Sequence, residues 1–317
     1  MLTATHAQDF HSRLANADPE VRRIAVMNLL DSDADDVETL LLAALQDADA
    51  KVRVEAARLL EGYETHAAVA RLIGALEDSD LEVCEAAAIS LSELKETPMG
   101  DGLLAALPKA KTPFAKAALF RALRELRRTE AFAPALAALH DSAVEIRCAA
   151  LGVLGYMKDG AALAEIARIA GADPDAEARR IAVGALGFAT DDLAAVTPAL
   201  KRALKDHSWQ VREEATATLG KLLVADAVND LIAAMADPYW QVRIKAARSL
   251  GKLKARSALP VLIDALGHAI SNLRKEAAIA LGEVGDAGAI AALEKALHDP
   301  DPDVRKLAQL ALNQILK

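Results

Sequence analysis

Residues 237–251 read DPYWQVRIKAARSLG, and variants of this phrase recur along the whole chain of 317 residues. Close copies are DADAKVRVEAARLL at 47–60 and DPDVRKLAQLAL at 301–312. The arginine of the phrase defines a column of ten positions spaced 31 to 33 residues apart: Arg22, Arg53, Cys84, Ala115, Arg147, Arg179, Arg212, Arg243, Arg274 and Arg305. A fixed period of this length indicates a solenoid, in which each repeat buries its apolar face only against its neighbours.

The composition predicts that the repeats are helical. The chain is 53% hydrophobic but only 3% aromatic, and alanine and leucine dominate its apolar residues. Small side chains let helices approach closely, and alanine is the best helix former. No stretch combines apolar–polar alternation with β-branched enrichment, so we expect an all-α chain without strands.

The last repeat shows the plan of one unit. Residues 286–299 (DAGAIAALEKALHD) carry apolar residues at helical spacing, and after a short turn residues 303–317 form a second such helix. We name these helices A and B. Gly155, Gly220, Gly251 and Gly282 follow the apolar core of other B helices, so we expect them to cap those helices with positive φ.

Ten such units predict one elongated domain. We place them at about residues 1–32, 33–63, 64–96, 97–128, 129–157, 158–189, 190–223, 224–254, 255–285 and 286–317. Neither an apolar run long enough for a membrane span nor a secretory signal is recognisable. Cys84 and Cys148 fall in different units, beyond disulfide reach, so we expect reduced thiols and a cytoplasmic protein.

The repeated phrase resembles the HEAT-repeat family, and most closely its short bacterial form, which also occurs in phycobilisome-lyase-type proteins. This resemblance covers the whole chain and implies a right-handed α-α superhelix of about ten two-helix repeats. It also implies that a turn aspartate and the arginine of helix B link neighbouring units through hydrogen bonds, because a charge-assisted ladder suits half-buried groups between layers. The matching residues are Arg22, Arg53, Arg147, Arg179, Arg212, Arg243, Arg274 and Arg305, with Asp47, Asp78, Asp141, Asp173, Asp206, Asp237 and Asp299.

Two units break this column. Cys84 replaces the arginine in the third unit, and Ala115 replaces it in the fourth, where Lys109 stands at the position of the turn aspartate. The break predicts either a local change of superhelical twist, such as a hinge, or sequence drift in a tolerant scaffold.

The residues give no support for catalysis or metal binding. His140, His207, His268 and His298 lie at A–B turns of different units, where we expect them to be turn and capping residues. The sequence has no Cys-x-x-Cys pair, no His-x-x-x-His pair and no phosphate-binding glycine loop. We therefore predict a non-enzymatic protein without a cofactor or metal.

Charge is unevenly distributed along the chain. Residues 1–101 carry a net charge of −13 and residues 102–317 a net charge of +4, which indicates either a basic partner at the acidic end or a solubilising end-cap. The most basic stretch contains Lys109, Lys111, Lys116, Arg121, Arg124, Arg127 and Arg128. Solvated helix faces explain it more simply than a nucleic-acid site, given the acidic first third of the chain.

The chain's two tryptophans occupy the same slot, three residues before the arginine column, in adjacent units. Because B helices line the concave side in the HEAT family, Trp209 and Trp240, stacked and exposed beside Tyr239, would form an interaction hot spot. The alternative is that each tryptophan covers the turn of its own unit. The full predicted partner-binding set is Trp209, Tyr239, Trp240, Ile244, Arg248, Phe120, Leu81 and Ile89.

We therefore predict a HEAT-repeat scaffold or adaptor that binds another protein through its concave B-helix face, as a monomer or weak oligomer. A chaperone-like or lyase-like helper that acts on a protein-bound chromophore is the first alternative. Nucleic-acid binding through residues 109–128 is the second.

Overall fold

The structure, a computed structural model, describes residues 11–31 and 36–317, and every regular element in that part of the chain is helical. The predicted all-α fold of stacked helix pairs, an α-α superhelix, is confirmed. By its internal contacts the chain divides into two compact units, one up to residue 157 and one from residue 158 to 317. The finer division into ten repeats within one domain stays a prediction.

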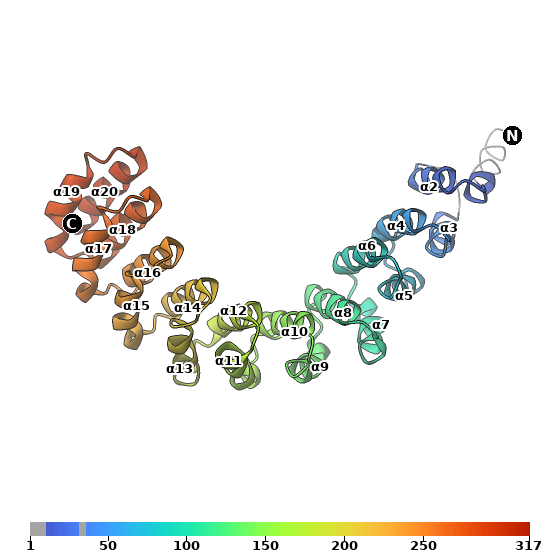
Figure 1. The fold of residues 1–317 in the computed structure, drawn as a ribbon, viewed down its shortest axis with the longest axis horizontal. Coiled ribbons are helices and arrows are strands. Elements are labelled where there is room, and N and C mark those ends of the chain that lie inside the picture. The colour runs from blue at the N-terminus through green and yellow to red at the C-terminus, as the bar shows by residue number, and fades with distance from the viewer. Residues whose placement is uncertain (1–10, 32–35) are drawn as a thin grey trace. The chain divides into compact units, whose positions relative to one another are not determined.

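In the first unit the even-numbered helices form one layer and the odd-numbered helices a second layer (Figure 1). The even-numbered B helices are α2 (Pro19–Met27), α4 (Ala50–Leu59), α6 (Leu81–Ser92), α8 (Pro113–Glu125) and α10 (Val144–Met157). The odd-numbered A helices are α3 (Val37–Ala44), α5 (His66–Ala75), α7 (Gly100–Ala106) and α9 (Phe132–Ala138). From α4 to α10, each B helix packs against the B helix before it and against the A helix of its own repeat.

The second unit repeats this arrangement. Its A helices are α11 (Leu163–Ala172), α13 (Leu193–Ala203), α15 (Val228–Ala234), α17 (Leu259–Ala265) and α19 (Ile290–Ala296). Its B helices are α12 (Ala176–Ala185), α14 (Trp209–Lys221), α16 (Trp240–Lys252), α18 (Ser271–Val284) and α20 (Pro302–Ile315). A short 3-10 turn precedes many of the A helices, for example Arg256–Ala258 before α17.

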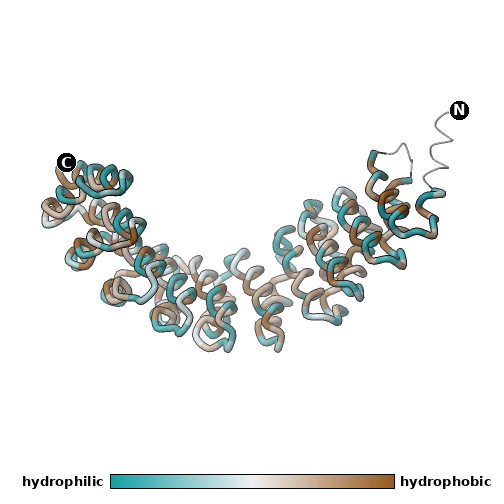
Figure 2. The backbone as a smooth tube through the Cα atoms, turned by 45° about the horizontal axis from the view of Figure 1, so that its top comes forward, coloured by the Kyte–Doolittle hydropathy of each residue, from teal (hydrophilic) through white to brown (hydrophobic). Residues whose placement is uncertain are grey.

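The core of each unit lies between the two layers and consists mainly of leucine, alanine and valine. Hydrophobic and hydrophilic residues alternate along the helices, which Figure 2 shows along the backbone. Leu72, Leu151 and Leu250 are among the leucines that are at most 1% exposed. Apolar burial of this kind is the main source of stability for the stack.

A second aspartate of the repeated phrase caps the B helices. Asp18, Asp49, Asp80, Asp175 and Asp301 are the N-cap residues of α2, α4, α6, α12 and α20, and the side chain of each accepts the backbone N–H two residues later. Such caps satisfy amide groups that have no partner within the helix. In the pattern Asp-x-Asp, the second aspartate is therefore the N-cap of helix B.

The prediction that glycines cap the B helices with positive φ is wrong for Gly155, Gly220, Gly251 and Gly282. Among the described glycines only Gly285 has positive φ, at 66°. Gly220, Gly251 and Gly282 instead lie where adjacent B helices touch: a Cβ on Gly251 would be 2.8 Å from Cα of Ala280, and one on Gly282 would be 2.9 Å from Cα of Ala311. The absence of a side chain is therefore what allows these helices to approach closely.

Candidate partner-binding surface

Arginine side chains of B helices pair with aspartates in the turn before the next B helix. Arg53 in α4 donates from Nε and Nη2 to both carboxylate oxygens of Asp78, at 2.8 and 2.7 Å. Its Nη1 donates to the carbonyl oxygens of Asp47 and Ala48 in its own turn, at 2.8 and 3.1 Å. The same bidentate pairing occurs for Arg22–Asp47, Arg179–Asp206, Arg212–Asp237 and Arg274–Asp299. We call this set of pairs the ladder.

Backbone groups also contact other predicted ladder residues. Arg147 is 7% exposed and donates to the carbonyls of Asp141 and Ser142, while Asp173, 6% exposed, accepts the N–H of Asp175. Arg305 in the last B helix donates to the carbonyls of Asp299 and Pro300 in its own turn.

The ladder carboxylates are held in their charged form. The guanidinium of Arg22 lowers the pKa of Asp47, and that of Arg274 lowers the pKa of Asp299. For Asp237, burial works to raise the pKa, but the hydrogen bonds from Arg212 and from the N–H of Tyr239 outweigh it and the pKa is lowered. The ladder is therefore a set of ionised, half-buried links between repeats.

The prediction that Ala115 fills the arginine position of the fourth repeat is wrong by one residue. In α4 the arginine is the fourth helical residue after the N-cap Asp49, and in α8, whose N-cap is Thr112, that residue is Lys116. Lys116 Nζ donates to Asp141 at 2.9 Å, across the same 25-residue separation as Arg53 and Asp78. The turn position two residues before the N-cap is likewise Ala110, and not Lys109.

One ladder position is therefore missing both of its charged members. Cys84 takes the arginine position in α6 and donates from Sγ to the carbonyl of Asp78, at 3.3 Å, as the arginines do in their own turns. Ala110 takes the opposing aspartate position. The α6–α8 junction is held by packing, without the ion pair found at the α4–α6 junction.

The same shift of register removes Phe120 from the predicted surface. Phe120 is 1% exposed and belongs to the core, and the residue at the equivalent outward position of α8 is Arg121. The irregular boundary before α8 carries the extra residue, so a column drawn from an unbroken 31-residue spacing placed a core phenylalanine on the surface.

A histidine stands at one aspartate position of the ladder. Nε2 of His268 lies 3.2 Å from Nη1 of Arg243, and Nδ1 of His268 accepts the N–H of Ile270 at 3.1 Å. A neutral imidazole has only one acceptor nitrogen, so it can satisfy only one of these two donors. This link is therefore weaker than an Arg–Asp pair.

Replacing His268 by aspartate is expected to stabilise the protein. A carboxylate at this position accepts from both Arg243 and Ile270, which should raise the free energy of unfolding by about 1 kcal/mol. Urea unfolding followed by circular dichroism measures the change. His298→Asp, in an exposed turn position next to an existing ladder aspartate, is the matched control and should have no such effect. Equal or lower stability of His268→Asp would contradict the assignment.

Three aromatic side chains gather where α14 and α16 begin. The rings of Trp209 and Tyr239 are stacked, with centroids 5.4 Å apart and planes 13° from parallel. Tyr239 is 45% exposed and Trp240 is 37% exposed, while Trp209 is half-buried. The predicted stack of Trp209 on Trp240 is thus replaced by a stack of Trp209 on Tyr239, with Trp240 beside it in sequence.

The ladder positions this aromatic cluster. Asp237 accepts the backbone N–H of Tyr239 at 2.9 Å, which fixes the start of α16. Arg212, which pairs with Asp237, also has its Cζ 5.7 Å from the centre of the Tyr239 ring. The cation–π contact and the stacking hold Tyr239 between a charged group and an indole.

Two further predicted residues lie along α16. Ile244 is half-buried one turn after Trp240. Arg248 donates from Nε and Nη2 to both carboxylate oxygens of Glu276 in α18, at 2.8 and 2.7 Å, and Glu276 is 6% exposed. Arg248 therefore links two B helices, and its charge is neutralised within the unit.

The remaining predicted residues belong to the first unit. Leu81 and Ile89 are 60% and 59% exposed on α6, with the exposed Glu85 midway between them on the same face. They form a small apolar stripe with an acidic residue at its centre.

Acidic partners occupy much of the basic stretch at residues 109–128. Lys116 pairs with Asp141, Arg124 with Glu125, and Arg128 with both Asp101 and Glu130. A surface that binds phosphates needs cations free of acidic neighbours, so this stretch is poorly suited to nucleic acid.

Within residues 11–31 and 36–317 no cluster of histidine, cysteine and carboxylate side chains has the geometry of a metal site. No helix of that part of the chain combines the length and apolar character needed to cross a bilayer.

Comparison with known proteins identifies the repeats. A family model described as HEAT repeats matches residues 7–92, 37–124, 166–238 and 228–313. A search of curated proteins found no match in sequence.

Several solved structures have a similar fold. YibA of Escherichia coli is 21% identical, with a TM-score of 0.57 over 95% of this chain and 98% of that protein. Kap95p, solved with RanGDP, is 13% identical with a TM-score of 0.59, and the match covers 98% of this chain but 49% of Kap95p. The karyopherin Kap121p, solved with the extreme C-terminus of the phosphatase Cdc14p, is 15% identical with a TM-score of 0.56 over 99% of this chain and 41% of its own. At these identities the likeness shows the fold alone.

Proposed function

The chain belongs to the HEAT-repeat family, and from this membership we propose that it is a non-catalytic scaffold that binds another protein through its B helices. The structures of Kap95p and Kap121p, which share its fold, each contain a bound protein or protein segment. Stacked helix pairs provide extended surfaces, and repeat proteins commonly use them for recognition. No cluster of metal-ligating groups competes with this interpretation in the described part of the chain.

The centre of the proposed surface is the aromatic cluster of Trp209, Tyr239 and Trp240. The observation that carries the proposal is the exposure of Tyr239 and Trp240, 45% and 37%, in a position fixed by the Arg212–Asp237 pair. Exposed aromatic residues on a rigid support lose little conformational entropy on binding, and tryptophan, tyrosine and arginine dominate interface hot spots. Trp209 contributes by stacking on the ring of Tyr239, which holds that ring in place.

The competing interpretation is that the rings only cover the turns of their own repeats. Covering a turn would bury a ring against the start of its own helix. Half-buried Trp209 instead stacks on Tyr239 of the next repeat. Tyr239 and Trp240 keep a large part of their surface in solvent, where aromatic area is unfavourable unless a partner covers it.

Loss of the aromatic cluster is expected to remove the partner. Affinity purification from the native organism should recover a partner with the wild type, and Tyr239→Ala and Trp240→Ala should each reduce its recovery at least tenfold. Leu310→Ala is the matched control, because Leu310 is 48% exposed on α20 of the same unit and lies outside the cluster.

Circular dichroism of each variant separates loss of binding from loss of folding. Equal recovery of the partner with Tyr239→Ala, Trp240→Ala and Leu310→Ala would exclude this cluster as the binding site.

A further inference from the structure

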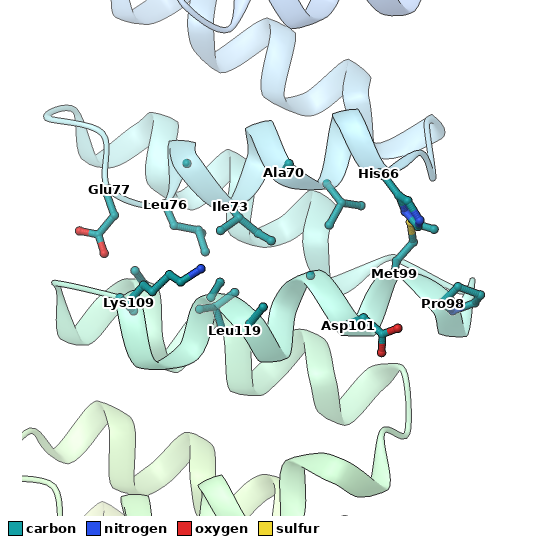
Figure 3. Close-up of a pocket in the computed structure, with 17 residues that line it drawn as sticks. His66, Ala70, Ile73, Leu76, Glu77, Pro98, Met99, Asp101, Lys109 and Leu119 are labelled. Carbon is teal, nitrogen blue, oxygen red and sulfur yellow. The ribbon is translucent and has the colours of Figure 1, made fainter.

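A groove of about 600 Å³ separates α5 from α7 in the first unit (Figure 3). Val69, Ile73, Leu76 and Leu119 form one side and the floor, and alanines of α7 form the other side. Small-molecule sites in proteins have roughly 300–1,000 Å³ and are mostly apolar. The groove lies in the A layer of the first unit, and none of its lining residues belongs to the aromatic cluster.

The groove coincides with the missing position of the ladder. Ala110, which replaces the ladder aspartate, lines it, together with Ala115. Helix α7 has only seven residues and lies between two 3-10 turns, Thr97–Met99 and Leu107–Lys109. A Cβ on Gly102 would be 3.9 Å from Ile73 and Val69, and one on Gly74 would have no atom within 4 Å. The groove between α5 and α7 therefore has three causes: α7 is short, the ladder ion pair is missing, and the facing residues are small.

Lys109 is the only lysine or arginine among the residues that line the groove. Figure 3 shows the amino group of Lys109 directed between Leu76 and Leu119. Lys109 makes no ion pair within 4 Å with the residues that the structure describes. Glu77, at the same end, has Oε1 held by the N–H groups of Lys111 and Thr112, at 2.7 and 3.3 Å.

His66 and Met99 narrow the other end of the groove. Nδ1 of His66 lies 3.3 Å from Sδ of Met99, so these side chains meet across the opening. Asp101, at this end, shares the guanidinium of Arg128 with Glu130, at 2.6 and 3.0 Å. The groove is therefore an apolar channel into which Lys109 directs its amino group, with the carboxylate of Asp101 at the opposite end.

We propose that this groove binds a single straight-chain fatty-acid anion (an alkanoate), with the carboxylate at Lys109 and the alkyl chain extending towards Met99. Charge complementarity at Lys109 favours an anionic head, and the apolar walls favour a tail without polar groups. An extended peptide would fit poorly, because the helical walls have already used their backbone donors and acceptors and would leave the peptide's own groups unpaired.

The first test measures binding to the full chain by isothermal titration calorimetry, with octanoate, decanoate and dodecanoate below their micelle concentrations. Affinity should rise about three- to fourfold for each added methylene. Dodecyltrimethylammonium, with the same tail and the opposite charge, should bind at least tenfold more weakly than dodecanoate. No binding of dodecanoate, or equal binding of the cationic amphiphile, would overturn the proposal.

Two variants locate the site. Lys109→Gln should weaken dodecanoate about fivefold and leave dodecan-1-ol unchanged, since only the head group loses a partner. Gly102→Leu should weaken both ligands at least tenfold, because its side chain occupies the groove while its Cβ makes only ordinary contacts. Ala105→Leu on the same wall is the second blocking variant if Gly102→Leu fails to fold.

Unchanged dodecanoate affinity in a folded blocking variant would place binding elsewhere, for example on the exposed aromatic cluster, and would refute the site. Blocking variants should retain the protein partner of the B helices, so failure of one proposal is distinguishable from failure of the other.

Discussion

Gly251→Ala is expected to lower the free energy of unfolding by about 2 kcal/mol, although alanine favours helices over glycine by about 1 kcal/mol. The new Cβ would lie 2.8 Å from Cα and 3.0 Å from Cβ of Ala280 and would also collide with the carboxylate of Glu283. Backbone atoms of α18 cannot rotate away, so α16 and α18 have to separate. The resulting loss of packing exceeds the gain in helix propensity.

Urea unfolding followed by tryptophan fluorescence suits this test, because both tryptophans of the chain lie in the second unit, one of them at the start of α16. Gly74→Ala in α5 is the matched control, and a Cβ there meets nothing within 4 Å. By circular dichroism that variant should be more stable by about 0.5–1 kcal/mol. Stability of Gly251→Ala equal to or above that of the wild type would mean that the two helices approach less closely than the structure shows.

These glycines show where sequence and structure differ. The period of 31 to 33 residues predicts a solenoid, and the apolar spacing within one unit predicts its helix pairs. The end of the phrase, Leu-Gly, is equally compatible with a helix cap and with close helix packing. The contact between Gly251 and Ala280 shows that close helix packing is the correct interpretation. This contact joins two neighbouring repeats, and the sequence of one repeat does not reveal how closely its neighbour approaches.

The candidate site was predicted only in part for a related reason. Trp209 and Trp240 were recognisable because they share one slot, but the partner of Trp209 is Tyr239, from the turn of the next repeat. Phe120 was misplaced because one extra residue before α8 shifts the register of that helix, and the N-cap Thr112 is the signal that could have revealed it. The groove beside α7 lies where Cys84 and Ala110 replace the charged pair of the ladder. Its volume depends on the spacing between helices, which the sequence alone does not give.

Acidification is expected to remove the contribution of the ladder in a defined pH range. Each ladder aspartate whose pKa the structure lowers, such as Asp47 and Asp299, binds its proton more weakly in the folded than in the unfolded protein. Stability is therefore fully present above the ordinary aspartate pKa of about 4 and is lost as the pH falls through the lower, folded-state values. Outside the ladder proper, the N-cap Asp301 follows the same rule, because its hydrogen bond with Lys275 lowers its pKa to about 2.

The five bidentate Arg–Asp pairs make this effect large. Their aspartate side chains are between 8% and 15% exposed, so solvent weakens each pair without removing it. At about 1 kcal/mol for each pair, the loss between pH 5 and pH 2 is on the order of 5 kcal/mol. Such a loss is comparable with the whole stability of many domains, so urea midpoints measured between pH 7 and pH 2.5 should fall steeply below pH 4.

The variant Asp237→Asn measures how much one ladder aspartate contributes to the free energy of unfolding. The amide keeps the shape of the side chain but accepts more weakly from Arg212, so at pH 7 the variant should be less stable than the wild type by about 1 kcal/mol. At pH 2.5 the difference should shrink towards zero, because the wild-type carboxyl is then becoming protonated as well. The exposed Asp226, outside the ladder, provides the control variant Asp226→Asn, which should behave like the wild type at both pH values.

A difference that stays constant with pH would show that Asp237 acts through shape and helix capping and not through its charge. The aromatic cluster that Asp237 and Arg212 hold would then rest on packing alone, and its exposure should not change with acid.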